Sequence, residues 1–360
     1  MNFNSFFLRS FRILLFPFSL LYGLIIIIRN FLYNRNILKS AEFNLPIICI
    51  GNLVMGGTGK SPMVEYLLTL LHERFHIATL SRGYKRKTKG YALANESTTA
   101  LDIGDEPMQF FTKFPQVPVA VGEERIVAIP QLLHDKPDTE AIILDDAFQH
   151  RAITAGLNIL LTVYNDLYTD DFFLPTGDLR DQKISAKRAQ IIVVTKCPSD
   201  LAQEEKNKII KQVRQSDEQQ IFFTSIEYQT PYHIFTKTLK PVSLNDEVLL
   251  VYGIANAQTL KDHISDNSAA YEEINYNDHH IFTIDDLKDI SRKFDKVQSV
   301  NKLILTTEKD AVRFLKFKKE LVNLPLYVLP VKPCFLFGEG DNFNKMVIDF
   351  IAGFKREIIE

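Results

Sequence analysis

Cysteine is scarce in this sequence of 360 residues, and neither sign of charge is in clear excess. Cys49, Cys197 and Cys334 lie far apart, without the short spacings of a zinc site. An odd, scattered set also argues against a disulfide framework and fits a reducing cytosol. The formal net charge of −2 gives no general case for nucleic-acid binding, and we expect no nucleic-acid partner. No internal repeat or low-complexity tract is visible.

What the chain does contain is enough apolar material for a substantial core. The hydrophobic share of 46% and the charged share of 24% are those of a folded protein, not of a disordered one. At this length two domains are expected.

The N-terminal segment, residues 1–45, differs from the rest. It carries five basic residues against Glu42 alone, and residues 13–28 are apolar and uncharged. As a helix this run would be about 24 Å long, against about 30 Å of hydrocarbon. Both flanks are basic, so the positive-inside rule gives no orientation. We expect a monotopic or peripheral membrane anchor, with a single span, a cleaved signal peptide and an ordinary buried helix as alternatives.

Beyond residue 45, short apolar runs alternate with helical stretches. Most of the runs are too short for helices and end at turn or charged residues, which is typical of buried parallel strands. In the first half, the expected strands are 45–50, 77–80, 117–121, 141–144, 157–161 and 191–195, and the expected helices include 60–73 and 201–215.

A second series of the same kind follows a Phe- and Tyr-rich stretch at 220–237. It comprises expected strands at 248–252, 303–305 and 326–329, with helices after 256, from 308 and within 341–356. We therefore predict an α/β fold with helices on both faces of its sheet. A P-loop NTPase-like parallel-sheet domain is expected over 46–219, a hairpin-like linker over 220–244, and a smaller α/β domain over 245–360.

The strongest chemical motif is GGTGKS at 56–61, between an expected strand and an expected helix. The strict Walker A pattern has glycine where Val54 stands. The three glycines still allow backbone N–H groups to approach phosphate oxygens, and the helix adds its positive end. The alternative is a glycine-rich turn with a solvated lysine. We predict that this loop binds the phosphates of a nucleotide, through Val54, Met55, Gly56, Gly57, Thr58, Gly59, Lys60 and Ser61.

Two aspartates, Asp145 and Asp146, follow the run at 141–144. Ligands of open α/β sheets bind at the carboxyl ends of the strands. A carboxylate there can hold Mg²⁺ together with the hydroxyl of Ser61. The alternative is that both aspartates simply begin the next loop.

The sequence does not support a guanine-specific switch. Such proteins read the base with Asn/Thr-Lys-x-Asp, whereas Thr195-Lys196-Cys197 is followed by Pro198. Partitioning ATPases have an additional lysine where Met55 stands. Thr307-Glu308-Lys309-Asp310 is better interpreted as a helix start, with Thr307 as the N-cap.

A kinase also needs a residue that orients or deprotonates the acceptor hydroxyl. Gly104-Asp105-Glu106-Pro107 offers two carboxylates, although acidic residues also simply favour the start of a helix. Asp278-His279-His280 is the second candidate, and a lone histidine is more often structural. The residues alone leave both readings open.

An ordered series of motifs resembles the tetraacyldisaccharide 4′-kinase family of lipid A synthesis. The resemblance covers nearly the whole chain. It comprises GGTGKSP at 56–62, SRGY at 81–84, GDEP at 104–107, Val121-Gly122 with Arg125, DDAFQH at 145–150, LPTGDLRD at 174–181, GIAN at 253–256, Asp278-His279 and TEKDAVR at 307–313. Two positions depart from the family pattern, since Ala147 and Lys85 stand where glycine is usual.

The resemblance implies transfer of the γ-phosphoryl group of ATP to the 4′-hydroxyl of a tetraacyldisaccharide 1-phosphate. It implies Asp105 as the catalytic base with His279 as its partner, in a cleft between the domains. It also implies a nucleotide and Mg²⁺ set and a substrate set. The Mg²⁺ ligands would be Ser61, Glu106, Asp145 and Asp146, and the substrate region would include Arg82, Arg125, Gln149, His150 and Arg180.

The resemblance also gives the membrane segment a reason, because the substrate's acyl chains stay in the bilayer while ATP is cytosolic. We expect the protein at the cytoplasmic face of the inner membrane, with no obligate protein partner. The alternative function is a membrane-associated P-loop ATPase switch that regulates a protein partner.

Overall fold

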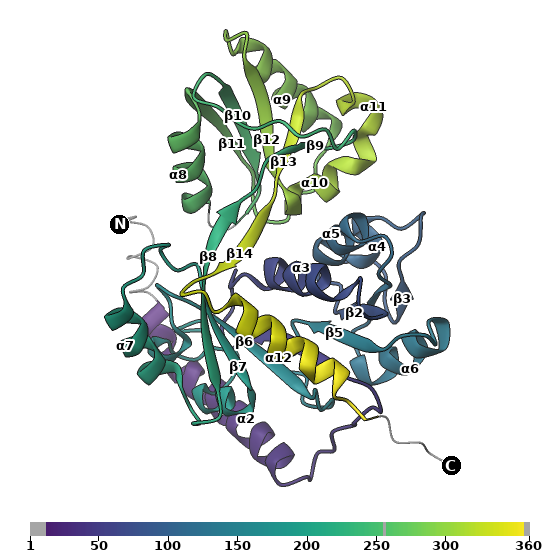
Figure 1. The fold of residues 1–360 in the computed structure, drawn as a ribbon, viewed down its shortest axis with the longest axis vertical. Coiled ribbons are helices and arrows are strands. Elements are labelled where there is room, and N and C mark those ends of the chain that lie inside the picture. Colours follow the sequence, from purple (N-terminus) through teal and green to yellow (C-terminus); the bar gives the residue numbers. More distant parts are fainter. Residues whose placement is uncertain (1–11, 255–256, 356–360) are drawn as a thin grey trace.

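The computed structural model describes residues 12–254 and 257–355, and it divides the chain into a larger and a smaller lobe (Figure 1). Each lobe is built on one mainly parallel sheet with helices on both faces. The predicted α/β class is thereby confirmed. Part of the predicted segment 1–45 and two residues of the GIAN motif, Ala255 and Asn256, lie outside the described residues.

The larger sheet has nine strands in the order β14-β8-β7-β6-β1-β5-β2-β4-β3. Its inner strands are apolar and buried on both faces, which is why they appear in the sequence as short continuous runs. The neighbours pair in parallel except for β3 with β4 and β14 with β8. The strands are β1 (Ile47–Asn52), β2 (Ile77–Ser81), β3 (Ala92–Leu93), β4 (Val119–Val121), β5 (Ala141–Asp145), β6 (Leu157–Val163), β7 (Ile191–Thr195), β8 (Gln220–Tyr228) and β14 (Val331–Phe335).

Helices cover both faces of this sheet. On one face α3 (Lys60–Leu71), α5 (Asp105–Lys113) and α12 (Gly340–Ala352) bury a common core, and α4 (Ala100–Ile103) precedes α5. On the other face lie α6 (Arg125–Asp135) and α7 (Gln203–Val213). Short 3₁₀ turns complete the described part of the chain, at Ile13–Leu15, Tyr168–Asp170, Lys183–Arg188 and Leu315–Phe317.

The smaller sheet has five strands in the order β11-β10-β12-β13-β9, all parallel except β9. Its strands are β9 (Tyr232–His233), β10 (Glu247–Tyr252), β11 (Ala270–Asn275), β12 (Lys302–Thr307) and β13 (Leu326–Leu329). One face is covered by α9 (Ile284–Lys296), α10 (Glu308–Phe314) and α11 (Lys318–Leu321), and the other by α8 (Gln258–Asn267).

The C-terminal segment differs from the predicted domain layout. After β13 the chain returns to the larger lobe, where β14 pairs antiparallel with β8 and α12 joins the core of α3. The smaller lobe therefore does not extend to residue 360 as a sequence-continuous unit. Nor does 220–244 form a hairpin, because β8 belongs to the larger sheet while β9 pairs with β13. Two strands, β8 and β14, connect the lobes (Figure 1).

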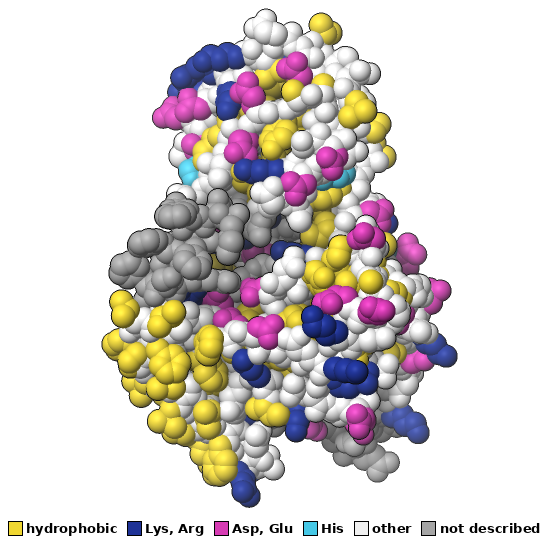
Figure 2. Space-filling view, turned by 90° about the vertical axis from the view of Figure 1, so that its left-hand side faces the viewer, with side chains coloured by type: hydrophobic (Ala, Val, Ile, Leu, Met, Phe, Trp, Pro, Cys, Tyr) yellow, Lys and Arg dark blue, Asp and Glu magenta, His cyan; other side chains and the backbone are white. Residues whose placement is uncertain are grey.

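The helix α2 (Phe16–Asn34) lies along the outside of the larger lobe. One narrow side of it faces the protein, where Ser19, Gly23 and Asn30 are buried. Most of its leucine, isoleucine and phenylalanine side chains face outward, and Figure 2 shows apolar side chains gathered along this edge of the lobe. By length and composition, residues 13–34 are apolar enough to cross a membrane.

The return of α12 to the larger lobe makes a testable prediction. Phe343 is fully buried and packs against Tyr66, Phe222 and Phe335. Phe343→Ala should lower the free energy of unfolding by about 3–5 kcal/mol, measured by urea denaturation. The matched change Phe172→Ala, at a side chain that is 59% exposed, should cost less than about 1 kcal/mol. Equal effects of the two substitutions would contradict the packing of α12.

Candidate active site between the lobes

The glycine-rich loop joins β1 to α3 at the carboxyl edge of the larger sheet. Gly56 and Gly59 have φ values of 124° and 85°, a region that only glycine adopts readily. The side chain of Thr58 is held inside the loop, where its hydroxyl accepts a hydrogen bond from Asn52 Nδ2 at 2.9 Å. The Thr195 hydroxyl donates to the Thr58 carbonyl at 2.9 Å. These hydrogen bonds fix the shape of the loop on the side that faces Asn52 and Thr195, and the opposite side of the loop is open.

The eight residues of the predicted nucleotide set differ in their surroundings. Val54 is buried and bridges to Leu179, and the Met55 side chain is 55% exposed. Both precede the part of the loop that curves into α3. Lys60 and Ser61 open α3, and Lys60 Nζ lies 3.6 Å from Asp146 Oδ1. The lysine therefore extends across the loop toward β5.

The pKa values of Asp145, the last residue of β5, and of Asp146, which follows it, are shifted in opposite directions. Asp145 is buried, and its Oδ1 has no hydrogen-bond partner in the described part of the chain. Burial, with the adjacent charge of Asp146, raises the pKa of Asp145 to about 7. Burial also disfavours the charge of Asp146, but Lys60 and Arg180 outweigh this and lower its pKa to about 2. A carboxylate oxygen without a donor, beside a phosphate loop, is suited to a cation.

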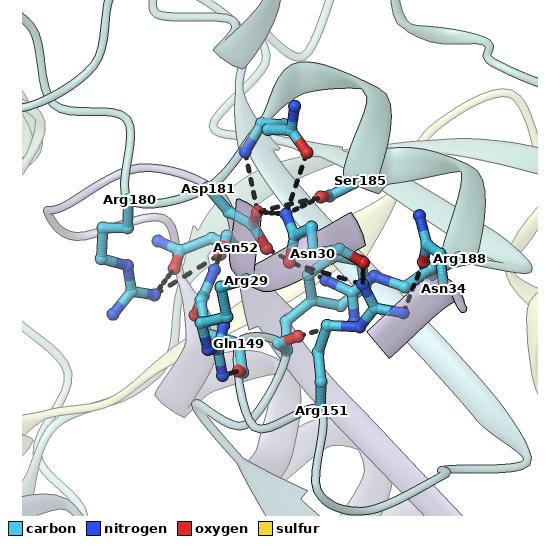
Figure 3. A network of polar contacts seen from close by, with 12 residues as sticks. Arg29, Asn30, Asn34, Asn52, Gln149, Arg151, Arg180, Asp181, Ser185 and Arg188 are labelled. Atoms are coloured by element: carbon cyan, nitrogen blue, oxygen red, sulfur yellow. Dashed lines mark hydrogen bonds and ion pairs between the residues drawn. The ribbon is translucent and has the colours of Figure 1, made fainter. Parts of the chain in front are cut away.

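The arginines of the predicted substrate set gather at the same edge of the sheet. Arg180 donates to Asp146 at 2.7 Å and also to the Asn52 side chain. Gln149 donates to the Asn52 carbonyl at 2.7 Å. Figure 3 shows this polar network continuing from Asn52 to residues of α2.

The remaining predicted substrate residues form a neighbouring cluster. Arg125 is only 2% exposed and donates to the Gly122 carbonyl at 2.8 Å, whereas Arg82 is exposed. Burial, followed by the charges of Arg125 and Arg82, lowers the pKa of His150 to about 4. His150 is thus neutral at physiological pH. It lies within electrostatic reach of Arg125 and Arg82, which favour an anionic ligand, and of Asp146, which opposes one.

The second predicted group, Asp105 and His279, comes from different lobes and meets at their interface. Asp105 is the first residue of α5, and His279 Nδ1 lies 2.8 Å from its Oδ2. Arg313 of α10 donates to the same oxygen at 2.7 Å. Burial alone would raise the pKa of Asp105, but the two hydrogen bonds and the charge of Arg313 lower it to about 2.

The backbone places these groups through unusual conformations. Gly104, which precedes α5, has φ 94°, and a Cβ there would lie 3.1 Å from the carbonyl oxygen of Tyr84. His279 itself has φ 64°, a conformation that few non-glycine residues adopt. Strained positions of this kind are frequent at functional sites.

Several contacts around this pair were not predicted. Lys309 Nζ lies 3.4 Å from Glu106, 3.1 Å from Asp278 and 3.2 Å from His279 Nε2. Glu106 is therefore ion-paired, and its charge also contributes to the raised pKa of Asp145. The start of α5 consequently lies within electrostatic reach of Asp145 at the end of β5.

A second link between the lobes lies at the far end of α5. Lys113 Nζ lies 2.6 Å from Glu65 of α3 and 2.7 Å from Glu308 of α10. Glu308 also accepts the backbone N–H of Val331, at the start of β14. Both ends of α5 are thus tied to α10 by ion pairs.

The sequence reading of TEKDAVR found the helix start but not the contacts of its charged residues. Thr307 caps α10, with its side chain accepting the N–H of Asp310, as predicted. Asp310 is buried and binds Arg313 at 3.0 Å. Asp310 and Arg313 are three residues apart on a helix, and this spacing was the available signal that Arg313 is held in a fixed position.

The similarity of this chain to known proteins identifies its family. The sequence model described as "LpxK: Tetraacyldisaccharide-1-P 4'-kinase" matches residues 11–351. A tetraacyldisaccharide 4'-kinase of Flavobacterium johnsoniae is 46% identical over 341 residues, covering 94% of this chain and 97% of that protein. The protein of the same name from Bacteroides thetaiotaomicron is 41% identical over 351 residues, covering 94% and 92%.

A solved structure has the same fold. It is described as LpxK from Aquifex aeolicus in complex with ATP, with a TM-score of 0.73 and 27% sequence identity. The alignment covers 95% of this chain and 99% of that one. Sequence and structure agree over nearly the full length, and the chain belongs to the tetraacyldisaccharide 4′-kinase family.

Proposed function

We propose that this protein transfers the γ-phosphoryl group of ATP to the 4′-hydroxyl of tetraacyldisaccharide 1-phosphate at the interface between its lobes. Membership of the kinase family supports the reaction. The observation that carries the assignment of residues is the geometry of Asp105. Its Oδ2 is occupied by His279 and Arg313, while no described residue donates to its Oδ1. One oxygen is fixed and the other is free for a hydroxyl.

In the proposed step, the acceptor oxygen attacks the γ-phosphorus. The bond from that phosphorus to the β,γ-bridging oxygen breaks, and ADP leaves. Asp105 Oδ1 accepts the hydroxyl proton. A carboxylate with a pKa of about 2 is a weak base, but phosphoryl transfer proceeds through a loose transition state that needs orientation more than early deprotonation. His279 and Arg313 supply that orientation.

The phosphate chain is bound by the glycine-rich loop in this proposal. Its backbone N–H groups and the N-terminus of α3 favour negative charge, and Lys60 neutralises the charge near the β and γ phosphates. Arg180 lies beside Lys60 through their shared partner Asp146. Arg82, Arg125, Gln149 and His150 then form the region that receives the substrate.

The described residues fit Mg²⁺ bound jointly with the nucleotide. They contain no group of three or more His, Cys, Asp and Glu residues arranged to hold a metal by themselves. Mg²⁺ commonly takes one or two protein oxygens and completes its shell with phosphates and water. The unpartnered Oδ1 of Asp145 and the Ser61 hydroxyl would supply such oxygens, with Asp146 and Glu106 nearby. Mg²⁺ would neutralise charge on the β and γ phosphates.

The position of α2 supports a monotopic association of the protein with the membrane. Polar side chains along its inner side bind the larger lobe, and Ser19 donates to Thr176 at 2.7 Å. Arg29 donates to the Gln149 carbonyl at 2.8 Å and Asn30 to Asp181 at 2.6 Å (Figure 3). These contacts along the inner side of α2 favour a helix that stays against the larger lobe over one that crosses the bilayer. Its outward apolar side is free to enter one leaflet.

We place the protein at the cytoplasmic face of the inner membrane, because ATP is available there and the acyl chains of the substrate remain in the bilayer. A regulatory ATPase switch is not favoured. Such a switch needs neither an acceptor base nor a histidine brought to it from a second lobe.

The base assignment predicts the effect of two substitutions. Asp105→Asn should lower kcat by about 10²–10⁴-fold, because the proton acceptor is lost and the ionic contact with Arg313 is weakened, while ATP still binds because the glycine-rich loop is unchanged. Lys60→Ala should weaken nucleotide binding as well as turnover. The assay uses labelled ATP, Mg²⁺ and lipid disaccharide 1-phosphate in detergent, with mapping of the phosphorylated position. Asp138→Asn, at an exposed position, is the control. Normal turnover by Asp105→Asn would refute its role.

The contact with Arg313 predicts a change in the titration of Asp105. Its lowered pKa means that its ion pairing stabilises the fold above about pH 4 and is lost as the pH falls toward about 2. Arg313→Gln removes one hydrogen bond and a positive charge, so the pKa of Asp105 should rise toward about 3.9. Carbon-13 NMR of the Asp105 carboxyl measures this. Arg292→Gln, in an exposed pair on α9, should leave it unchanged. An unaltered pKa in Arg313→Gln would contradict the contact.

The outward side of α2 predicts vesicle binding. Leu21 and Ile25 are 58% and 56% exposed, and burying each in lipid is worth about 1.5–3 kcal/mol. The double substitution Leu21→Glu with Ile25→Glu should therefore weaken binding to anionic phospholipid vesicles by at least about 100-fold. Co-sedimentation gives the measurement, and Val300→Glu in the smaller lobe is the control. Sedimentation of the double variant like the parent would exclude this membrane-binding side.

A further inference from the structure

Lys196 follows the last residue of β7 and lies against the glycine-rich loop. Its Nζ is 3.9 Å from the position that a Cβ on Gly57 would occupy. The residue has φ 58°, a left-handed conformation that is uncommon for lysine. The preceding Thr195 donates to the Thr58 carbonyl, so the end of β7 is fixed to the loop. The ammonium group is therefore positioned beside the loop by the backbone.

No negative charge accompanies this ammonium group. In the ranges 12–254 and 257–355, no hydrogen bond, ion pair or ring contact involves the Lys196 side chain. Burial lowers the pKa of Lys196. By contrast, Lys60 on the same loop has Asp146 as a partner. A partly buried ammonium group beside a glycine-rich loop, with no acidic partner in the described part of the chain, is suited to bind an anion there.

The order of strands indicates which part of a nucleotide Lys196 would meet. In the sequence β7-β6-β1-β5, the loop follows β1, and the aspartates lie on the β5 side of it. Lys60 extends toward the β5 side of the loop, where the charge of Glu106 also acts on Asp145. The γ-phosphate must face the same side in order to reach Asp105. The α-phosphate and the ribose then lie toward β6 and β7, where Lys196 stands.

We propose that Lys196 is a nucleotide-binding residue whose ammonium group contacts the α-phosphate and ribose end of ATP. The proposal rests on the nucleotide site proposed above. It assigns a role to the Thr-Lys-Cys-Pro segment, which lacks the aspartate that reads guanine. The lysine holds the common part of a nucleotide without selecting its base. Lys60 and Lys196 would then bind the two ends of the phosphate chain from opposite sides of the loop.

The test compares ATP and ADP binding to the full chain in detergent. Lys196→Met keeps most of the side chain and removes the charge. Because the contact is at the nucleoside end, the Kd values for ATP and ADP should both rise about tenfold, with kcat changed by less than about twofold. Lys211→Met, at an exposed position of α7, is the matched control and should leave both Kd values unchanged.

Three results would overturn the proposal. ADP affinity could stay within twofold of the parent, which would show that Lys196 does not act at the nucleoside end. Loss of kcat with unchanged Kd values would place its effect on the chemical step. A large fall in the melting temperature of ligand-free Lys196→Met would assign it a structural role, since no partner is lost on substitution. Failure of the nucleotide site itself is recognised separately, by unchanged ATP binding in Lys60→Ala.

Discussion

The contact of Asp105 with His279 and Arg313 is the interaction on which the candidate site depends. It joins the first residue of α5, in the larger lobe, to two residues of the smaller lobe. Neither lobe alone contains both the glycine-rich loop and the groups that hold the carboxylate. The electrostatics make the dependence mutual, since Asp105 keeps its charge despite burial only because the smaller lobe provides donors. Without that lobe, burial would be relieved but the orientation of the carboxylate would be lost.

Local patterns predicted the strands that lie inside the sheets. The runs at 191–195 and 326–329 match β7 and β13, because residues buried on both faces must be apolar and turns limit them on each side. The sheet to which the C-terminal segment belongs could not be predicted in the same way. Whether β14 pairs with the first or the second sheet depends on contacts with β8, about 100 residues earlier, and nothing in its own sequence specifies that partner.

The residues of the candidate site also divide into those that the local sequence predicts and those that it does not. The glycine-rich loop and the strand-end aspartates follow from local chemistry and from the rule that parallel strands end at one edge of the sheet. The pairing of Asp105 with His279 was available only through the family resemblance, because 174 residues separate them. The contacts of Arg313 and Lys113 with the other lobe were not predicted, because charged residues are common on the surfaces of helices. Only the folded arrangement distinguishes the charges that reach another lobe. The roles of all these residues in catalysis stay predictions until the variants are measured.

The connection between the lobes has its own mechanical meaning. Because β8 and β14 are hydrogen-bonded neighbours, the chain crosses between the lobes as a ribbon with five paired positions. Sliding one strand along the other would break all the hydrogen bonds between them together. Bending the two strands out of their common plane breaks none of these bonds. A separation of the lobes would therefore take the form of a bend of this ribbon. In such a bend, His279 and Arg313 would return to Asp105 by the same motion each time, so the ribbon itself would guide the contact between the lobes.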